Sequence, residues 1–225
     1  MKFTYALALV VTAQVGYSQT AVHQKVRAPI WTFHESNTRT YGVNVGALSY
    51  DEIARNVTTV GARLEVPGIG LFLFLVPYLP IPRDSASFAA DSMHQLVERI
   101  HGLNISPLGS ACDCSLNGIN ISGGGTFFYR TNGLSASWAI NGAVIHNGVQ
   151  MAGWTQAYRM NGLQLSVMGA QAFDMHGVQI AAETGALRMR GLQIGLYNRA
   201  GDLKGLQIGL WNVNQRRKLP FFNWA

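Results

Sequence analysis

A five-residue unit that begins with glycine recurs down the C-terminal half of the chain at intervals of 14–16 residues. Each copy holds Gly, an apolar residue, Asn, Ser or Gln, a second apolar residue and a small residue. The eight copies begin at Gly102, Gly118, Gly133, Gly148, Gly162, Gly177, Gly191 and Gly205. A fixed period of this kind is typical of tandem-repeat proteins, in which neighbouring units stack because one unit cannot bury its own apolar side chains.

The same unit occurs earlier, so the repeat domain extends beyond the main array. Gly42-Val-Asn-Val-Gly46 is a clear copy and Gly61-Ala-Arg-Leu-Glu65 a degenerate one. We therefore predict one β-repeat domain over residues 19–225, with early repeats at 42–66, a main array at 102–212 and a C-terminal tail at 213–225. The interruption at 67–101 starts with a Pro-rich apolar segment, and the apolar spacing over 85–101 predicts a helix. We expect both to pack against the array as a cap or flank.

The apolar pattern changes phase at each glycine. Counting the glycine as zero, positions −4 and −2 are mostly apolar, whereas positions +1 and +3 are apolar in every copy. Because strand side chains alternate with a period of two, a straight strand cannot place both sets on one face. We therefore expect the chain to bend at the glycine and turn both sets inward. This leaves position +2 on a flat outer face, and the candidate interaction residues are Gln150, Gln164, Gln179, Gln193 and Gln207.

Three all-β architectures fit the repeat. We favour a β-solenoid of 14–16-residue coils with one inserted helix. An antiparallel hairpin meander is the second, because Asn-Gly pairs such as Asn117-Gly118 and Asn161-Gly162 suit two-residue turns. An outer-membrane β-barrel is the third, with one strand per repeat. Against the barrel, a straight strand would place Arg159, Asp174 and Arg188 on the same face as the aliphatic side chains.

The start of the chain predicts export. Met1-Lys2, the apolar run Phe3 to Val15 and the small residues Gly16 and Ser18 have the three-part pattern of a signal peptide at 1–18. The formal net charge is +6, and charged residues make up only 12% of the chain. Part of the charge lies in Arg216-Arg217-Lys218, which is typical of a solvated terminus. We expect no nucleic-acid binding, because no base-stacking motif accompanies these cations.

No catalytic, cofactor or metal motif emerges from the residue spacing, so the sequence predicts no catalytic residues, no cofactor and no metal. His94, Glu98 and His101 would share one side of the predicted helix, yet their order does not match a known ligand pattern, and a solvated polar face is the expected reading. Cys112 and Cys114 are expected to be unpaired small residues. A strained or intermolecular disulfide is the alternative for them.

Two late repeats and the C-terminus invite a family comparison. Gly191-Leu-Gln-Ile-Gly-Leu-Tyr-Asn198, Gly205-Leu-Gln-Ile-Gly-Leu-Trp-Asn212 and Arg217-Lys-Leu-Pro-Phe-Phe-Asn-Trp224 resemble the short surface-repeat proteins of bacteria. The resemblance implies an exported, mostly uncharacterised repeat protein with no catalytic residues to transfer. We therefore expect a non-enzymatic scaffold at the bacterial cell surface or outer envelope, with an unknown protein or envelope component as partner and possible membrane association. An outer-membrane barrel protein is the alternative.

Overall fold

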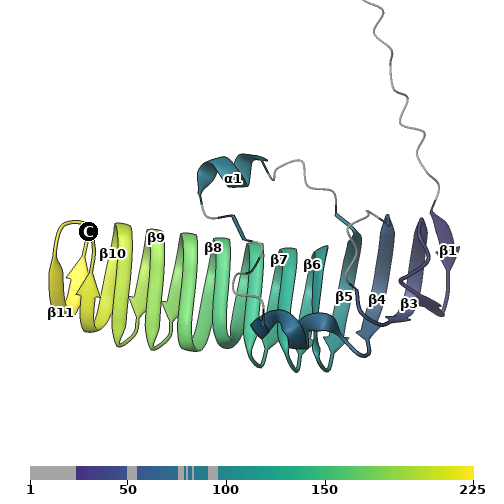
Figure 1. The fold of residues 1–225 in the computed structure, drawn as a ribbon. Helices are drawn as coiled ribbons and strands as arrows, with labels where there is room; N and C mark the ends of the chain where they lie inside the picture. Colours follow the sequence, from purple (N-terminus) through teal and green to yellow (C-terminus); the bar gives the residue numbers. More distant parts are fainter. Residues whose placement is uncertain (1–23, 50–54, 76–78, 80, 83, 91–95) are drawn as a thin grey trace, which may run out of the picture.

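The computed structural model describes residues 24–49, 55–75, 79, 81–82, 84–90 and 96–225. The predicted signal peptide and His94 lie outside the described residues. Among these residues the chain is almost entirely strand (Figure 1). In chain order the elements are β1 (Lys25–Arg27), β2 (Ile30–Thr32), β3 (Thr38–Gly46), β4 (Val57–Glu65), η1 (Ile69–Leu75), α1 (Ser85–Ala90), β5 (Glu98–Ser106), β6 (Gly109–Ser122), β7 (Gly125–Ser137), β8 (Ile140–Ile180), β9 (Glu183–Ile194), β10 (Tyr197–Val213) and β11 (Lys218–Trp224).

The fold is a β-solenoid of about 11 stacked turns. Each coil pairs in parallel with the next, and the repeat glycines lie opposite one another, from Gly42 and Gly61 through to Gly191 and Gly205. With coils about 4.8 Å apart, ten steps give a rod about 48 Å long. The parallel register rules out both antiparallel alternatives, the hairpin meander and the barrel. Only β11, among the described strands, pairs antiparallel, and it closes the C-terminal end on β10.

The Asn-Gly pairs do not form hairpin turns. The asparagine at position −1 of one coil instead donates a hydrogen bond to the asparagine one coil earlier. The distances are 2.6 Å from Asn132 to Asn117, 2.7 Å from Asn147 to Asn132 and 2.7 Å from Asn161 to Asn147. Parallel stacking thus uses a residue type that the sequence alone associates with turns.

The repeat glycine does not bring both apolar sets inward, so that prediction is wrong. Position −2 is buried, as expected, but positions +1 and +3 point outward and the +2 side chains lie inside. The strand keeps its alternation through the glycine, whose φ is positive, for example 132° at Gly177. A Cβ there would collide with the main-chain oxygen of Gly162, one coil earlier, which is why this column is glycine.

The apolar core runs along the inside of the rod. In the later coils it consists of alternating alanine and methionine or leucine, which come from positions −5 and −2: Ala157, Met160, Ala172, Met175, Ala186, Met189, Ala200 and Leu203. In these later coils the side chain at position −4 does not lie inside the rod, because the pairing between neighbouring coils leaves this position out. Ala172 pairs with Ala186 and Asp174 with Arg188, so Leu187 at position −4 is half exposed.

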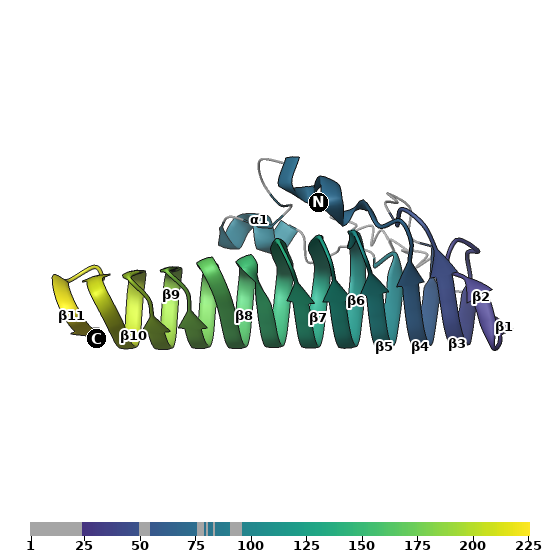
Figure 2. The ribbon, with the colours of Figure 1, turned by 90° about the horizontal axis from the view of Figure 1, so that it is seen from below.

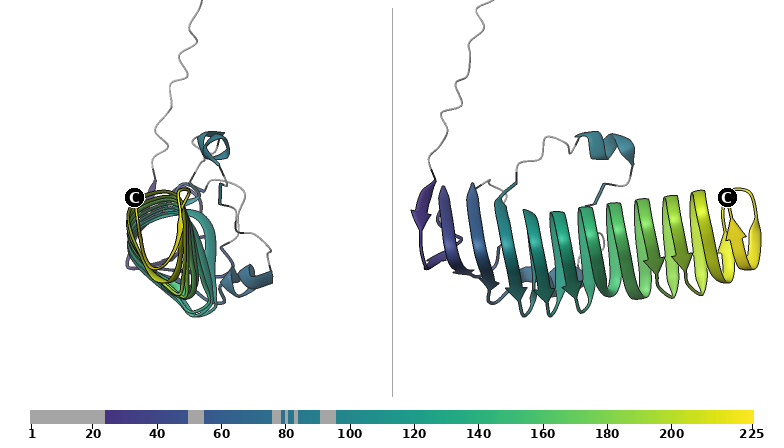
Figure 3. Two further views of the ribbon diagram at one scale, coloured as in Figure 1. Left: turned by 90° about the vertical axis from the view of Figure 1, so that its left-hand side faces the viewer. Right: turned by 180° about the vertical axis from the view of Figure 1, so that it is seen from behind.

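The interruption packs against one side of the array. Leu73 of η1 and Ile81 lie in one cluster with Phe127, Val144 and Tyr158 of the coils. Figures 2 and 3 show η1 and α1 outside the coils and on the same side of the stack. The predicted helix over 85–101 is confirmed for Ser85–Ala90 and is wrong from Glu98 on, since residues 98–106 form strand β5.

In the part of the chain that the structure describes, no helix is both long enough and apolar enough to cross a membrane.

Candidate functional site

The most unusual surface of the molecule is formed by positions +1 and +3 of ten coils. We call these two rows the aliphatic face, and all twenty residues are apolar. Its members are Val43, Val45, Ala62, Leu64, Leu103, Ile105, Ile119, Ile121, Leu134, Ala136, Val149, Met151, Leu163, Leu165, Val178, Ile180, Leu192, Ile194, Leu206 and Ile208. None of these side chains is buried, and Ile121 is 51% exposed. A strand face that contacts only solvent normally carries polar side chains. This long outward face carries none.

An apolar ridge borders this face at the corner that follows five of the last six repeat units, and after the unit at Gly177 the same positions hold Ala182 and Glu183. Its residues lie at positions +5 and +6, and they are Trp138, Trp154, Val167, Met168, Leu196, Tyr197, Leu210 and Trp211. Trp138 is 83% exposed and Val167 77%. Two shallow depressions of about 1030 Å³ and 650 Å³ lie between the ridge and the +3 row, and both include Ile180. They form one apolar trough along the C-terminal coils.

Strand β11 continues the aliphatic face into the last coil with aromatic residues. Trp224 lies opposite Leu206 of the +1 row, and Phe222 lies opposite Ile208 of the +3 row. Both aromatic side chains are more than half exposed. The guanidinium of Arg217 lies 4.2 Å from the ring centroid of Trp224 and donates a hydrogen bond to its main-chain oxygen at 2.9 Å. The face therefore ends in aromatic rings with a cation beside them.

Basic side chains also line the other edge of the aliphatic face. Position −1 lies across the glycine column from position +1, and in the later coils it holds His176, Arg190 and Lys204. Arg190 and Lys204 are exposed. The outer wall of these coils thus changes from cationic to aliphatic to aromatic over the length of one strand.

The five candidate glutamines do not form an outer face, and this prediction is wrong. Gln150, Gln164, Gln179, Gln193 and Gln207 are fully buried. Each amide nitrogen from Gln164 onward donates to the amide oxygen one coil earlier, at 2.7–3.0 Å. The same nitrogen also donates to a main-chain oxygen, as at 3.2 Å from Gln179 to Gly185. Buried amides are tolerated because every coil supplies the partners.

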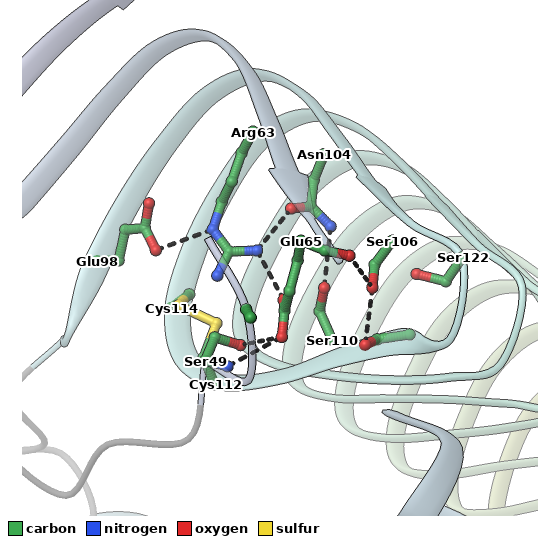
Figure 4. Close-up of polar contacts among 12 residues, drawn as sticks. Ser49, Arg63, Glu65, Glu98, Asn104, Ser106, Ser110, Cys112, Cys114 and Ser122 are labelled. Carbon is green, nitrogen blue, oxygen red and sulfur yellow. Dashed lines mark hydrogen bonds and ion pairs between the residues drawn. A yellow bond between two sulfur atoms is a disulfide. The ribbon is translucent and has the colours of Figure 1, made fainter. Parts of the chain in front are cut away.

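The amide column gives way to an ion cluster in the early coils (Figure 4). Arg63 holds position +2, is fully buried, and lies 2.9 Å from both Glu65 and Glu98 and 2.9 Å from Asn104. Burial opposes the charge on Arg63, but the two carboxylates raise the pKa of its guanidinium above the usual value. Burial likewise opposes ionisation of Glu65, yet Arg63 and hydrogen bonds from Ser110 and Ser49 lower the pKa of its carboxyl.

This ion cluster explains why the predicted helical polar face does not exist. Glu98 lies inside the coil, where it also accepts a hydrogen bond from Thr59 at 3.0 Å. His101, three residues later on the same strand, points outward toward Asn117. The two side chains are therefore on opposite faces of β5. Among the described residues no group of three or more His, Cys, Asp or Glu side chains could hold a metal ion.

The two cysteines are paired, contrary to the expectation of unpaired residues. Cys112 and Cys114 form a disulfide with a Cα to Cα distance of 5.1 Å. Residues two apart on a strand share a face, and the ladder between β6 and β7 has an irregularity between Cys112 and Ser115. Both cysteines are buried among Ile100, Leu116 and Phe128. The disulfide therefore belongs to the core and not to the surface.

One further buried ionisable side chain lies at position −2 of the array. His146 is fully buried where other coils place Thr131 or Met160. Burial lowers the pKa of its imidazole to about 4, against smaller opposite effects of main-chain groups of Val149 and Gly133. His146 is thus a neutral core residue at pH 7.

Comparison of the chain with protein-family models, with curated proteins and with solved structures found no match. The candidate site therefore rests on the geometry of the chain itself.

The candidate face lies on the strand that carries the five predicted glutamines, but on the opposite side of that strand. The residues that the structure exposes, positions +1 and +3, alternate with the glutamines that were predicted to be exposed. The uniformity of the glutamine column was the available signal, because stacking requires the same amide in successive coils and solvent contact does not.

Proposed function

We propose that the chain is an exported, non-enzymatic repeat scaffold that acts at the cell surface or envelope by presenting its aliphatic face to a partner. The observation that carries this proposal is the face itself, two outward rows of apolar side chains over ten coils without a polar residue. The largest exposed apolar patch on a typical soluble monomer measures about 300–600 Å² and is often a binding surface. With ten coils about 4.8 Å apart and a width of about 13 Å from position +1 to +5, the face and ridge together cover on the order of 600 Å².

The interior supports a scaffold role because it holds the face rigid. Every +2 side chain from Gln150 to Gln207 is tied to its neighbour by an amide hydrogen bond directly beneath the exposed rows. A surface that is preorganised in this way loses little conformational entropy when it binds a partner. The partner is an unknown protein or envelope component.

Export is proposed from the pattern of residues 1–18 and from the family resemblance, and it has its own test. The protein is produced in a bacterial host, and the mass of the mature chain is determined while intact cells are treated with an external protease. We expect the mature chain to begin at Gln19 and to be cleaved or released from intact cells. A chain that keeps residues 1–18 and stays in the cytoplasm would contradict export.

The face is tested separately with two glutamate substitutions. Ile194→Glu places a charge on the aliphatic face, whereas Leu187→Glu places the same charge on an exposed apolar residue of another wall. We expect the first variant to lose retention on the envelope and the second to keep it. Equal retention of the two variants would show that this face does not contact the partner.

A further inference from the structure

The described part of the chain covers one apolar wall of the rod and does not cover another. The side chains of η1 and α1 pack on the wall that carries Tyr158, where the Phe88 ring stacks on the Tyr158 ring with centroids 4.2 Å apart. No residue of the aliphatic face belongs to that cluster among the described residues. The bare wall therefore has a surface that the described part of the chain does not cover.

We propose that the aliphatic face, its ridge and the neighbouring cations bind an anionic lipid surface. This inference rests on the proposed function and names the chemistry of the partner. Protruding tryptophan and tyrosine side chains are favoured at the boundary between lipid headgroups and acyl chains, because their rings are apolar and carry one polar group. The ridge supplies such rings at Trp138, Tyr197 and Trp211, and β11 adds Trp224.

The charge distribution favours an anionic lipid surface over a second copy of the chain. Residues 138–225 contain eight Lys or Arg and three Asp or Glu, a net charge of +5 out of the +6 of the whole chain. Arg190 and Lys204 flank the aliphatic face, and Arg217 lies over Trp224. Two copies placed face to face would oppose these like charges, whereas anionic headgroups would neutralise them.

The straight shape of the face also suits a lipid surface. A lipid surface needs no shape complementarity beyond a straight apolar edge. The rod would lie flat, with the ridge at the level of the acyl boundary and the cations at the level of the headgroups.

The experiment uses the full chain and extruded vesicles of phosphatidylcholine, with or without phosphatidylglycerol, in a flotation assay. We expect the protein to float with the anionic vesicles and to be released by salt. Leu196→Ser combined with Leu210→Ser removes two exposed ridge side chains and should weaken binding at least tenfold. Leu187→Ser changes a half-exposed leucine on another wall, serves as the control and should bind as the unchanged protein does.

Two variants that each remove one positive charge complete the design. Arg190→Gln removes a cation beside the face and should weaken binding about fivefold at low salt. Lys25→Gln removes an exposed cation at the N-terminal end of the rod, away from the ridge, and should have no effect. All variants keep the same residues 1–18, so differences between them do not arise there. Circular dichroism of each variant checks that the β-structure is intact.

A second measurement needs no substitution. Brominated acyl chains quench tryptophan fluorescence on contact, and four of the five tryptophans lie on the ridge or on β11. We expect strong quenching with anionic vesicles. Several results would overturn the proposal: no flotation and no quenching, equal loss in the serine variants on both walls, or a dimer that the ridge variant dissociates while vesicles stay unbound. Protection of Met168 from peroxide in a lipid-free monomer would also overturn it, because another part of the chain would then cover the ridge.

If the vesicle results are negative while intact cells still display the protein, only the lipid inference fails. If the vesicle results are positive while the chain stays in the cytoplasm, the export part of the proposed function fails instead.

Discussion

Replacing one glutamine of the buried column by leucine should destabilise the protein although the new side chain is more apolar. Gln179 donates to the amide oxygen of Gln164 at 2.7 Å and to the main-chain oxygen of Gly185 at 3.2 Å, and it accepts a hydrogen bond from Gln193 at 2.8 Å. Gln179→Leu removes all three. It leaves the Gln164 oxygen and one N–H of Gln193 without their partners in a fully buried column.

The magnitude follows from those two groups. Each buried polar atom that loses its partner costs about 1–3 kcal/mol, so the pair costs about 2–6 kcal/mol. Burial of the leucine recovers about 1–2 kcal/mol, because the site is shaped for an unbranched side chain. The difference is about 0–5 kcal/mol, and we expect the free energy of unfolding to fall by about 2.5 kcal/mol, the middle of that range.

Urea unfolding followed by far-ultraviolet circular dichroism measures this change, and Leu206→Gln is the matched control. Leu206 is 37% exposed on the aliphatic face, so a glutamine there meets solvent and should change the unfolding free energy by less than about 0.5 kcal/mol. If Gln179→Leu were neutral or stabilising while Leu206→Gln cost more than about 2 kcal/mol, the assignment of inside and outside would be refuted.

Three further predictions concern other buried positions. The pKa of His146 is lowered to about 4 in the folded protein, so the unfolded chain binds the proton more readily. The free energy of unfolding should therefore fall by about 3 kcal/mol as the pH drops from about 6.5 to 4. His146→Met should remove that loss, as measured by urea titrations at each pH. Gly177→Ala should lower the free energy of unfolding by about 3 kcal/mol or more, because this position has a positive φ and the new Cβ would collide with the preceding coil. At Gly185 a new Cβ meets only one atom, at 3.8 Å, so Gly185→Ala should leave thermal unfolding nearly unchanged. Arg63→Leu leaves the buried carboxylates of Glu65 and Glu98 without their cation, so the free energy of unfolding measured with urea at pH 7 should fall by about 3–5 kcal/mol.

The stacking of coils was predictable because it depends on a period. The glycine column and the alternation around it require only that equivalent residues lie one above another, and Gly42, Gly61 and Gly102 do so across a long interruption. Steric exclusion of a Cβ at that corner is a local property of each repeat. A local property of this kind can be read from a single sequence.

The direction of the side chains was not predictable from hydrophobicity. The rule that apolar residues lie inside fails at positions +1 and +3, because the amides of the +2 column satisfy one another and the core is filled from positions −5 and −2. The cost of burying an amide depends on its partners in the neighbouring coils. That information lies in the stacking and not in any one repeat.

The extent of the helix and the state of the two cysteines were predicted wrongly. The apolar spacing over 85–101 favours a helix, but Glu98 is held in β5 by its ion pair with Arg63 and by register with β4. Cys112 and Cys114 come together inside the coil at an irregularity of the ladder that the spacing of two residues does not reveal. At Glu98, contacts with a distant segment override the local helix propensity.

The claim that positions +1 and +3 face outward is tested most directly by the oxidation of the natural methionines with hydrogen peroxide. Met151 is at position +3 and 38% exposed, and Met168 is on the ridge, whereas Met160, Met175 and Met189 at position −2 are fully buried. Peptide mass spectrometry measures the rate at which each becomes the sulfoxide. We expect Met151 and Met168 to oxidise readily in the folded protein and the three −2 methionines to be protected until denaturant is added. Protection of Met151 together with rapid oxidation of Met175 would contradict the account.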